Sequence, residues 1–307
     1  MNTMTSGVSP AERFAVFRIA RRAADVDGRL DERDRQLLAR FAAAAAPSAP
    51  EGGRDLAAAV AEIASPEARR LAYESAVGAC SADGLRGEDE TRFLARLGAM
   101  LGLAQPEVAS VAVTADALAT APLLALSSPG GPAVADAVPR IGDLEGIVLK
   151  AAIVNGALGR RPDSFSAMAI IPLQLKLVYR IGRAHGVEPS RAEARELLVA
   201  MGAGLAAQYL EQIARRLSAG RQVASREGGA AAADEGALFA FARTYAVGEV
   251  AREHYAAGHG MAPRPLVEAY VEALGCGQQL YSSHAAQIEA QARALDAHRL
   301  LQFVRSQ

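Results

Sequence analysis

Apolar and polar positions recur at helical spacing along most of the chain. Near the amino terminus Phe14, Phe17 and Ile19 share one face of a helix that we expect over residues 11–24. The same spacing, with the turn residues between segments, predicts further helices over 30–46, 55–63, 66–79, 88–101, 107–113, 115–124, 146–158, 165–184, 192–217, 236–257, 264–274 and a last one through Phe303. The pattern predicts an all-α protein.

Composition supports this and suggests two helical domains. The chain is rich in Ala, Leu, Arg and Glu and has no Trp, and straight-chain residues lose little rotamer freedom in a helix. A stretch of Ser, Pro and Gly within residues 126–140 predicts a linker, with one domain over 1–125 and a second over 141–307. Residues 218–236 are expected to form a flexible loop.

Charge and cysteine usage exclude several classes of function. Thirty-three basic and 34 acidic side chains nearly cancel, so no global field would attract nucleic acid. Cys80 and Cys276 lack the spacing of a disulfide framework or a zinc site. Charged residues interrupt the first twenty positions, and the uncharged stretch 197–210 is shorter than the roughly 20 residues that span a bilayer. We therefore expect a cytoplasmic protein that does not cross a membrane.

The most informative chemistry is a short acidic pattern that occurs twice, 56 residues apart. Asp27-Gly28 is followed by Asp34, and Asp83-Gly84 is followed by Glu90. The two copies continue alike into apolar helices, which indicates a duplicated structural unit. Glycine suits such a turn because it tolerates positive φ, and each later carboxylate falls in the first turns of the next helix.

These turns do not form complete EF-hand loops, because Ala23 and Ala79 stand where the first ligand is required. Two interpretations remain. Asp27 and Asp83 could cap the helices that follow, with Asp34 and Glu90 stabilising the helix dipoles. Alternatively, two copies packed antiparallel would pool their carboxylates around a divalent cation, Ca²⁺ in the first place, with a dissociation constant of roughly 10⁻⁴ to 10⁻³ M. The candidate metal ligands are Asp25, Asp27, Asp34, Asp83 and Glu90.

The paired turns, Val26-Asp27-Gly28 with Asp34 and Ala82-Asp83-Gly84 with Glu90, resemble the tellurite-resistance TerB-like domain. That resemblance implies an all-helical acidic module linked to metal binding and bacterial stress response. The first copy departs from the family pattern at Val26, where alanine is usual, and at Asp34, where glutamate is usual.

The second half resembles a different family. The segments Ile170-Ile171-Pro172-Leu173-Gln174-Leu175-Lys176-Leu177-Val178-Tyr179-Arg180-Ile181-Gly182, His185-Gly186 and Thr244-Tyr245-Ala246-Val247-Gly248 are similar to the YcjF-type domain of unknown function, which also follows the GTPase module of some Era-like GTPases. Where that family usually has an Asp, eight residues before Gln174, this chain has Ser166, with Asp163 nearby. The membrane-spanning hairpin that often precedes the domain is absent here.

Motifs for enzymatic chemistry are missing. Gly202-x-Gly204-x-x-Ala207 has the letters of a dinucleotide fingerprint, but no strand precedes it, so we expect these glycines at a close helix crossing instead. The sequence has no Walker A, HExxH or GxSxG pattern.

Together these features predict a non-enzymatic, metal-sensitive accessory or adaptor protein of the stress-response kind. It would contact a protein partner, or a second copy of itself, through its C-terminal domain, without binding nucleic acid. One alternative is a peripheral scaffold at the inner membrane, or a partner of a GTPase, using the apolar helices of the second domain. Another is a metal-dependent hydrolase that uses the same carboxylates.

Overall fold

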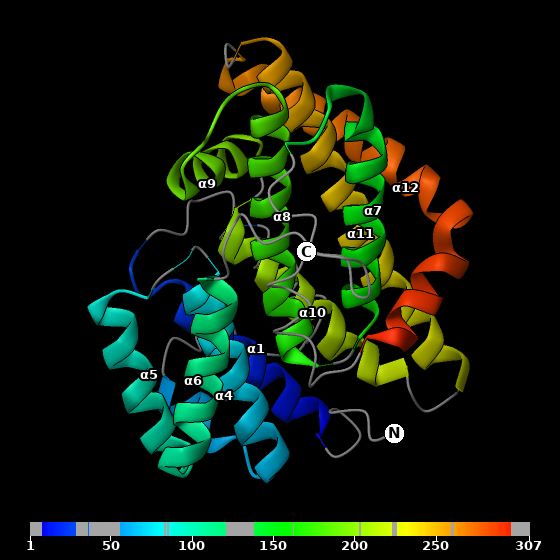
Figure 1. The fold of residues 1–307 in the computed structure, drawn as a ribbon. Coiled ribbons are helices and arrows are strands. Elements are labelled where there is room, and N and C mark those ends of the chain that lie inside the picture. Colours follow the sequence, from blue (N-terminus) through cyan, green and yellow to red (C-terminus); the bar gives the residue numbers. More distant parts are fainter. Residues whose placement is uncertain are drawn as a thin grey trace. The chain divides into compact units, whose positions relative to one another are not determined.

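The computed structural model describes residues 8–28, 36, 56–82, 84, 86–120, 138–161, 163–202, 204–222, 226–258 and 261–295. Within these ranges the chain forms α-helices and one short 3-10 turn, and no strand (Figure 1). The prediction of an all-α fold is confirmed for this part of the chain.

The helices belong to two compact units, each built from separated stretches of sequence. Unit 1 comprises residues 1–120, 162–168 and 204–233, and unit 2 comprises 121–161, 169–203 and 234–307. The predicted linker lies mostly outside the described residues, so the domain limits 1–125, 126–140 and 141–307 stay a prediction.

Unit 1 is organised around one central helix. Its elements are α1 (Pro10–Ala24), α3 (Leu56–Ala61), α4 (Pro66–Ser81), α5 (Glu88–Met100), α6 (Gln105–Ala119), α10 (Leu205–Gln222) and the first residues of α8 and α11. Every residue of α4 from Leu71 to Cys80 is buried, and α4 packs against α1, α5, α6 and α10. A helix buried on all sides belongs at the centre of a helical domain.

A single glycine fixes how closely α10 approaches α4. A methyl group at Gly78 would overlap the hydroxyl and ring of Tyr209, which is itself fully buried. Because only a residue without Cβ leaves room for that ring, Gly78 and Tyr209 specify this packing together.

Unit 2 contains η1 (Ile141–Asp143), α7 (Leu144–Arg160), the greater part of α8 (Ser164–Ala184), α9 (Arg191–Ala200), most of α11 (Arg226–Ala256) and α12 (Pro263–Ala294). Helix α8 continues through Pro172, although proline removes one backbone donor. The helices predicted over 146–158 and 165–184 are both confirmed.

Helices α7 and α11 cross at very short range. A Cβ built on Gly159 would lie 2.3 Å from the carbonyl oxygen of Gly236, and one on Gly248 would lie 2.5 Å from Val148 Cγ1. Position 159 therefore faces 236 while 148 faces 248, which means that the two helices run antiparallel. This is a close helix crossing within unit 2.

The sequence predicted a close helix crossing at Gly202 and Gly204, but neither glycine lies in a helix. The expected helix over 192–217 is two helices, α9 and α10, separated at residues 201–204. Gly202 is exposed and has φ of 79°, a left-handed conformation that ends a helix. The small residues that suggested close packing instead mark a helix C-terminus.

At two other places the chain is helical where the sequence predicted a break. Helix α11 begins at Arg226, inside the stretch expected to be a flexible loop, and its alanine run has high helix propensity. Helix α12 continues through Gly275 and Gly277 to Ala294 as one element. Gly277 packs against the backbone of Ala242, so this glycine serves a helix contact rather than a turn.

Candidate functional site

The candidate site of unit 1 is built on the pairing of α1 with α4, and a buried carboxylate joins their amino-terminal ends. Glu12 closes a capping box on α1: its Oε2 accepts from the Ser9 N–H at 2.8 Å. Its Oε1 accepts from the N–H groups of Ala64 and Ser65, at 3.1 and 2.7 Å, where α4 begins. Both helices therefore start at the same place.

The environment of Glu12 strongly favours its ionised form. The side chain is 6 % exposed, and burial alone would raise its pKa. Hydrogen bonds from the Ser65 and Ser9 backbones outweigh that burial and hold the pKa at about 2, against an ordinary value of 4.5. Glu12 is thus a charged clamp between two helix N-termini, whose unpaired N–H groups favour a negative charge.

The carboxyl-terminal ends of the same helices also meet. The thiol of Cys80 on α4 donates to the carbonyl oxygen of Ala23 on α1, at 3.6 Å, and both groups are buried. With Glu12 at one end and this contact at the other, α1 and α4 run in the same direction. The second helix of the first copy lies outside the described residues, so the antiparallel packing of the two whole copies stays a prediction.

This direction has a consequence for the acidic turns. Asp25 to Gly28 follows α1 directly, and the segment with Ala82 and Gly84 follows α4 directly. Because the two helices end side by side, the two turns leave from the same end of unit 1. Antiparallel helices would have sent them to opposite ends.

The glycines of both turns have the conformation that the sequence predicted. Gly28 has φ of 71° and Gly84 has φ of 130°. The N–H of Gly28 donates to Asp25 O at 3.4 Å, and that of Gly84 donates to Ser81 O at 3.1 Å. The helix predicted to end at Asp25–Gly28 does so, with Asp25 as its C-cap residue.

The five predicted metal ligands have different outcomes. Asp34 and Asp83 lie outside the described residues, Asp25 is half-buried and Asp27 is exposed. Glu90 is 7 % exposed, in the first turn of α5. Within the described residues, no three His, Cys, Asp or Glu side chains come close enough to hold a metal ion. A site that uses all five carboxylates stays a prediction.

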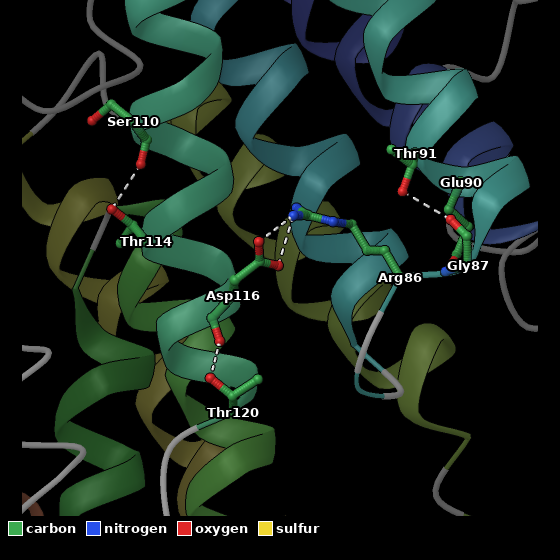
Figure 2. Close-up of polar contacts among 8 residues, drawn as sticks. All are labelled: Arg86, Gly87, Glu90, Thr91, Ser110, Thr114, Asp116 and Thr120. Carbon is green, nitrogen blue, oxygen red and sulfur yellow. Dashed lines mark hydrogen bonds and ion pairs between the residues drawn. The ribbon is translucent and has the colours of Figure 1, made fainter.

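Glu90 has a clear structural role (Figure 2). Its Oε2 accepts from the Gly87 N–H at 2.7 Å, while Thr91 Oγ1 donates to the Gly87 carbonyl at 2.9 Å. This confirms the prediction that Glu90 stabilises the start of its helix. The N-cap of α5 is Gly87, however, so the expectation that Asp83 caps this helix is wrong.

An arginine that follows the second acidic turn forms an ion pair with helix α6. Figure 2 shows Arg86, which follows Gly84 by two residues, reaching Asp116 on α6, with nitrogen–oxygen distances of 2.6 Å. The Arg86 side chain is 12 % exposed. Its partner Asp116 is 47 % exposed, so only the guanidinium side of this ion pair is shielded from water.

Sequence reasoning missed Glu12 and Arg86. Ser9-Pro10-Ala11-Glu12 has the Ser-x-x-Glu spacing of a capping box with proline at the first helical position, so a signal for the start of α1 was present. Nothing in the sequence indicated that Glu12 also reaches α4, 52 residues away. Arg86 had no local signal, because its partner is 30 residues further along.

In unit 2 the structure brings together two of the three segments that resemble the YcjF-type domain, 170–182 and 244–248. Thr244 Oγ1 accepts from Asn155 Nδ2 at 2.8 Å and from Gln174 Nε2 at 3.1 Å, and Asn155 Nδ2 also lies 3.3 Å from Ile170 O. All three polar side chains are completely buried. The motif residues Gln174 and Thr244 therefore join α7, α8 and α11 in the core.

No protein-family model matches the chain, and neither does a curated protein or a solved structure. Both family resemblances therefore stay predictions. Among the described residues no single helix is long and apolar enough to cross a membrane. Two successive helical segments separated by a short break, Arg191–Ala200 and Leu205–Arg215, meet the length and composition criteria only when taken together.

Proposed function

We propose that this protein is a non-enzymatic, metal-sensitive accessory or adaptor protein of the TerB-like kind, with weak Ca²⁺ binding at its two acidic turns. The single observation that supports the proposal is the shared direction of α1 and α4. Their ends meet at Ala23 and Cys80, and each end continues into a turn with a positive-φ glycine. Two acidic segments that leave one end of a domain together can supply oxygen ligands to the same cation.

Repulsion explains why a cation would matter there. Asp25 and Asp27 belong to the first turn, and Asp83, which lies outside the described residues, belongs by sequence to the segment that follows α4. In the proposed site these carboxylates would share one cation. Like charges at short range raise the free energy of the folded state unless a cation or protons neutralise them. Calcium would then stabilise this end of unit 1. A partner that binds only the more rigid form would distinguish the calcium-bound protein from the calcium-free protein.

The adaptor role is proposed for unit 2, in a cytoplasmic protein. Exposed apolar side chains on its helices include Val199 on α9 and Val271 on α12. A protein partner or a second copy of the chain could cover such residues. This part of the proposal also accommodates a GTPase as the partner.

The test is a calcium titration of the full chain, followed by thermal unfolding in phosphate-free buffer. Binding to the folded state raises the melting temperature, and saturation to 100 times the dissociation constant would add roughly 2.7 kcal/mol. We expect a smaller but measurable rise at millimolar Ca²⁺, and its loss in the double variant Asp27→Asn, Asp83→Asn.

The matched control is Asp89→Asn, which removes an exposed carboxylate that pairs with Arg92 on α5. This variant should keep the full response to calcium. A double variant that responds like the wild-type protein would show that the turns do not bind the ion. The full chain is required, because unit 1 includes α10, which a fragment ending at residue 125 lacks.

A further inference from the structure

Helix α12 has one face packed into unit 2 and the opposite face in solvent. The buried residues of this helix share its inner face: Leu266, Tyr270, Gly277 and Ile288. Helical spacing places Gln279, Ser282 and Ala286 on the opposite face, and all three are exposed. The outer face of α12 is therefore available to a partner.

This outer face has no charge along its middle. Between Glu272 and Glu289 the sequence contains no Asp, Glu, Lys or Arg, over residues 273–288 and roughly four helical turns. The solvent face of a surface helix normally carries charged side chains. Charges are instead depleted at the centre of a protein interface and return at its rim. The charge distribution on α12 is thus typical of an interface.

Residues along the outer face follow the alternating four- and three-residue spacing of a coiled-coil seam. They are Glu268, Glu272, Gly275, Gln279, Ser282, Ala286, Glu289 and Arg293. An average spacing of 3.5 residues keeps one stripe of a helix against a partner helix. A Cβ built on Gly275 would meet no described atom within 4 Å, so no described contact requires glycine there. Glycine lowers the stability of a helix interior, and a second backbone at close range is a reason to have it.

The charges at the two ends of the seam select an antiparallel second copy as the partner. In a parallel pair of identical helices, Glu268 and Glu272 would each face their own copy and repel it. In an antiparallel pair centred between residues 280 and 281, Glu268 faces the partner's Arg293, and this attraction occurs twice. The same centre bisects the charge-free segment 273–288. A surface that complements its own copy in this way is suited to a two-fold dimer.

One like-charged pair remains in this arrangement, Glu272 with the partner's Glu289. The Glu289 carboxylate is 2.6 Å from Arg293 and 3.9 Å from Arg160 in its own chain. Those guanidinium groups offset its charge and reduce the repulsion.

We propose that the outer face of α12 is a homodimer interface, in which two copies of the helix pair antiparallel about the midpoint between Leu280 and Tyr281. This inference rests on the self-association proposed above for unit 2, and it names the surface and the partner. Exposed Val271 borders the seam and adds apolar area to the contact. Because the central side chains are small or uncharged, the dimer is expected to exchange with the monomer.

The test is sedimentation equilibrium of the full chain over a range of concentrations. EDTA removes calcium, and a reductant prevents a disulfide through Cys276, which is exposed. We expect a concentration-dependent equilibrium between monomer and dimer. A chain that stays monomeric up to its solubility limit would overturn the proposal, and so would a larger assembly, because a two-fold contact closes at two copies.

A pair of matched variants locates the contact. Gln279→Lys places a charge in the charge-free segment and should raise the dimer dissociation constant roughly tenfold or more. Gln287→Lys is the same change at an exposed position of α12 outside the seam, and it should dimerise as the wild-type protein does. Equal dissociation constants for the two variants would place the contact elsewhere.

Charge reversal tests the direction of pairing. Glu268→Arg alone, or Arg293→Glu alone, puts like charges at both ends of the dimer and should raise the dissociation constant by roughly tenfold. The double reversal should restore the wild-type affinity, although it removes the pairs of Glu268 with Arg264 and of Arg293 with Glu289 within the helix. Additive weakening in the double variant would exclude the antiparallel pairing.

The interface and the proposed calcium site can fail separately. Gln279→Lys should keep the rise in melting temperature with calcium, whereas the double variant Asp27→Asn, Asp83→Asn should keep the dimer in EDTA. Loss of the dimer in that double variant would place the contact in unit 1 and overturn the assignment to α12.

Discussion

Two helix pairs in this molecule accommodate buried polar groups in opposite ways. In unit 1, α1 and α4 share a full negative charge, Glu12, at their amino-terminal ends. In unit 2, the buried polar contact between α7 and α11 is made by neutral groups, Asn155 and Thr244, which lie within the body of both helices rather than at their starts. In these two pairs, the charged group lies at the helix starts and the neutral groups lie within the helices.

The physical reason is the supply of backbone donors. The first N–H groups of a helix have no partner within it, so a carboxylate placed there gains several hydrogen bonds. In the middle of a helix every N–H is already used, and an isolated charge would pay a large desolvation cost. Neutral amides and hydroxyls can instead satisfy one another, as Gln174 and Thr244 do.

The largest expected change in the free energy of unfolding comes from blocking the close approach of α7 and α11. Gly159→Leu should lower the free energy of unfolding by roughly 3 kcal/mol, because its Cβ alone would collide with the Gly236 backbone. Gly146→Ala in the same helix has open space around its Cβ and should stabilise by roughly 0.5 to 1 kcal/mol. Urea unfolding of both variants measures the contrast, and two changes of the same sign would contradict the crossing.

The second prediction tests the neutral network. Thr244→Val keeps the shape of the side chain but removes the oxygen that accepts from two buried amides, so it should cost roughly 2 kcal/mol. The control is Thr114→Val on α6, whose hydroxyl donates to Ser110 O near solvent. That change should stay within about 0.5 kcal/mol. Equal losses in the two variants would mean that burial adds nothing to the network.

The smallest effect concerns the charged clamp and depends on pH. Glu12 has a folded-state pKa of about 2, below its ordinary 4.5. Its contribution is therefore complete above pH 4.5 and is lost as the pH falls toward 2. At neutral pH, Glu12→Gln should cost roughly 1 to 2 kcal/mol. The same variant should lose less stability than the wild-type protein between pH 4.5 and 2.

Glu107→Gln is the matched control for this prediction. Glu107 accepts from the Ala104 N–H in the same kind of capping box on α6, but it is exposed and the bond stays within its own helix start. Its replacement should change stability by less than about 0.5 kcal/mol. If both variants have the same acid profile, the link from Glu12 to α4 contributes nothing.

Local signals in the sequence predicted the turns and many of the helices. Gly28 and Gly84 were assigned positive φ because the residue type allows it, and both have it. The same local reasoning misplaced the small residues. Three glycines have three different roles: Gly202 ends helix α9, Gly275 lies within helix α12, and Gly159 permits the close crossing of α7 and α11.

The sequence by itself determined what depends on neighbours along the chain: the helical class and the positive φ of Gly28 and Gly84. For Glu90 it offered two roles, and the structure shows the one at the start of α5. Only the tertiary structure decided that α1 and α4 run in the same direction, because this follows from Glu12 meeting Ser65 and Cys80 meeting Ala23. Periodicity specifies which face of a helix is buried, but it carries no information about the direction of the helix that covers it.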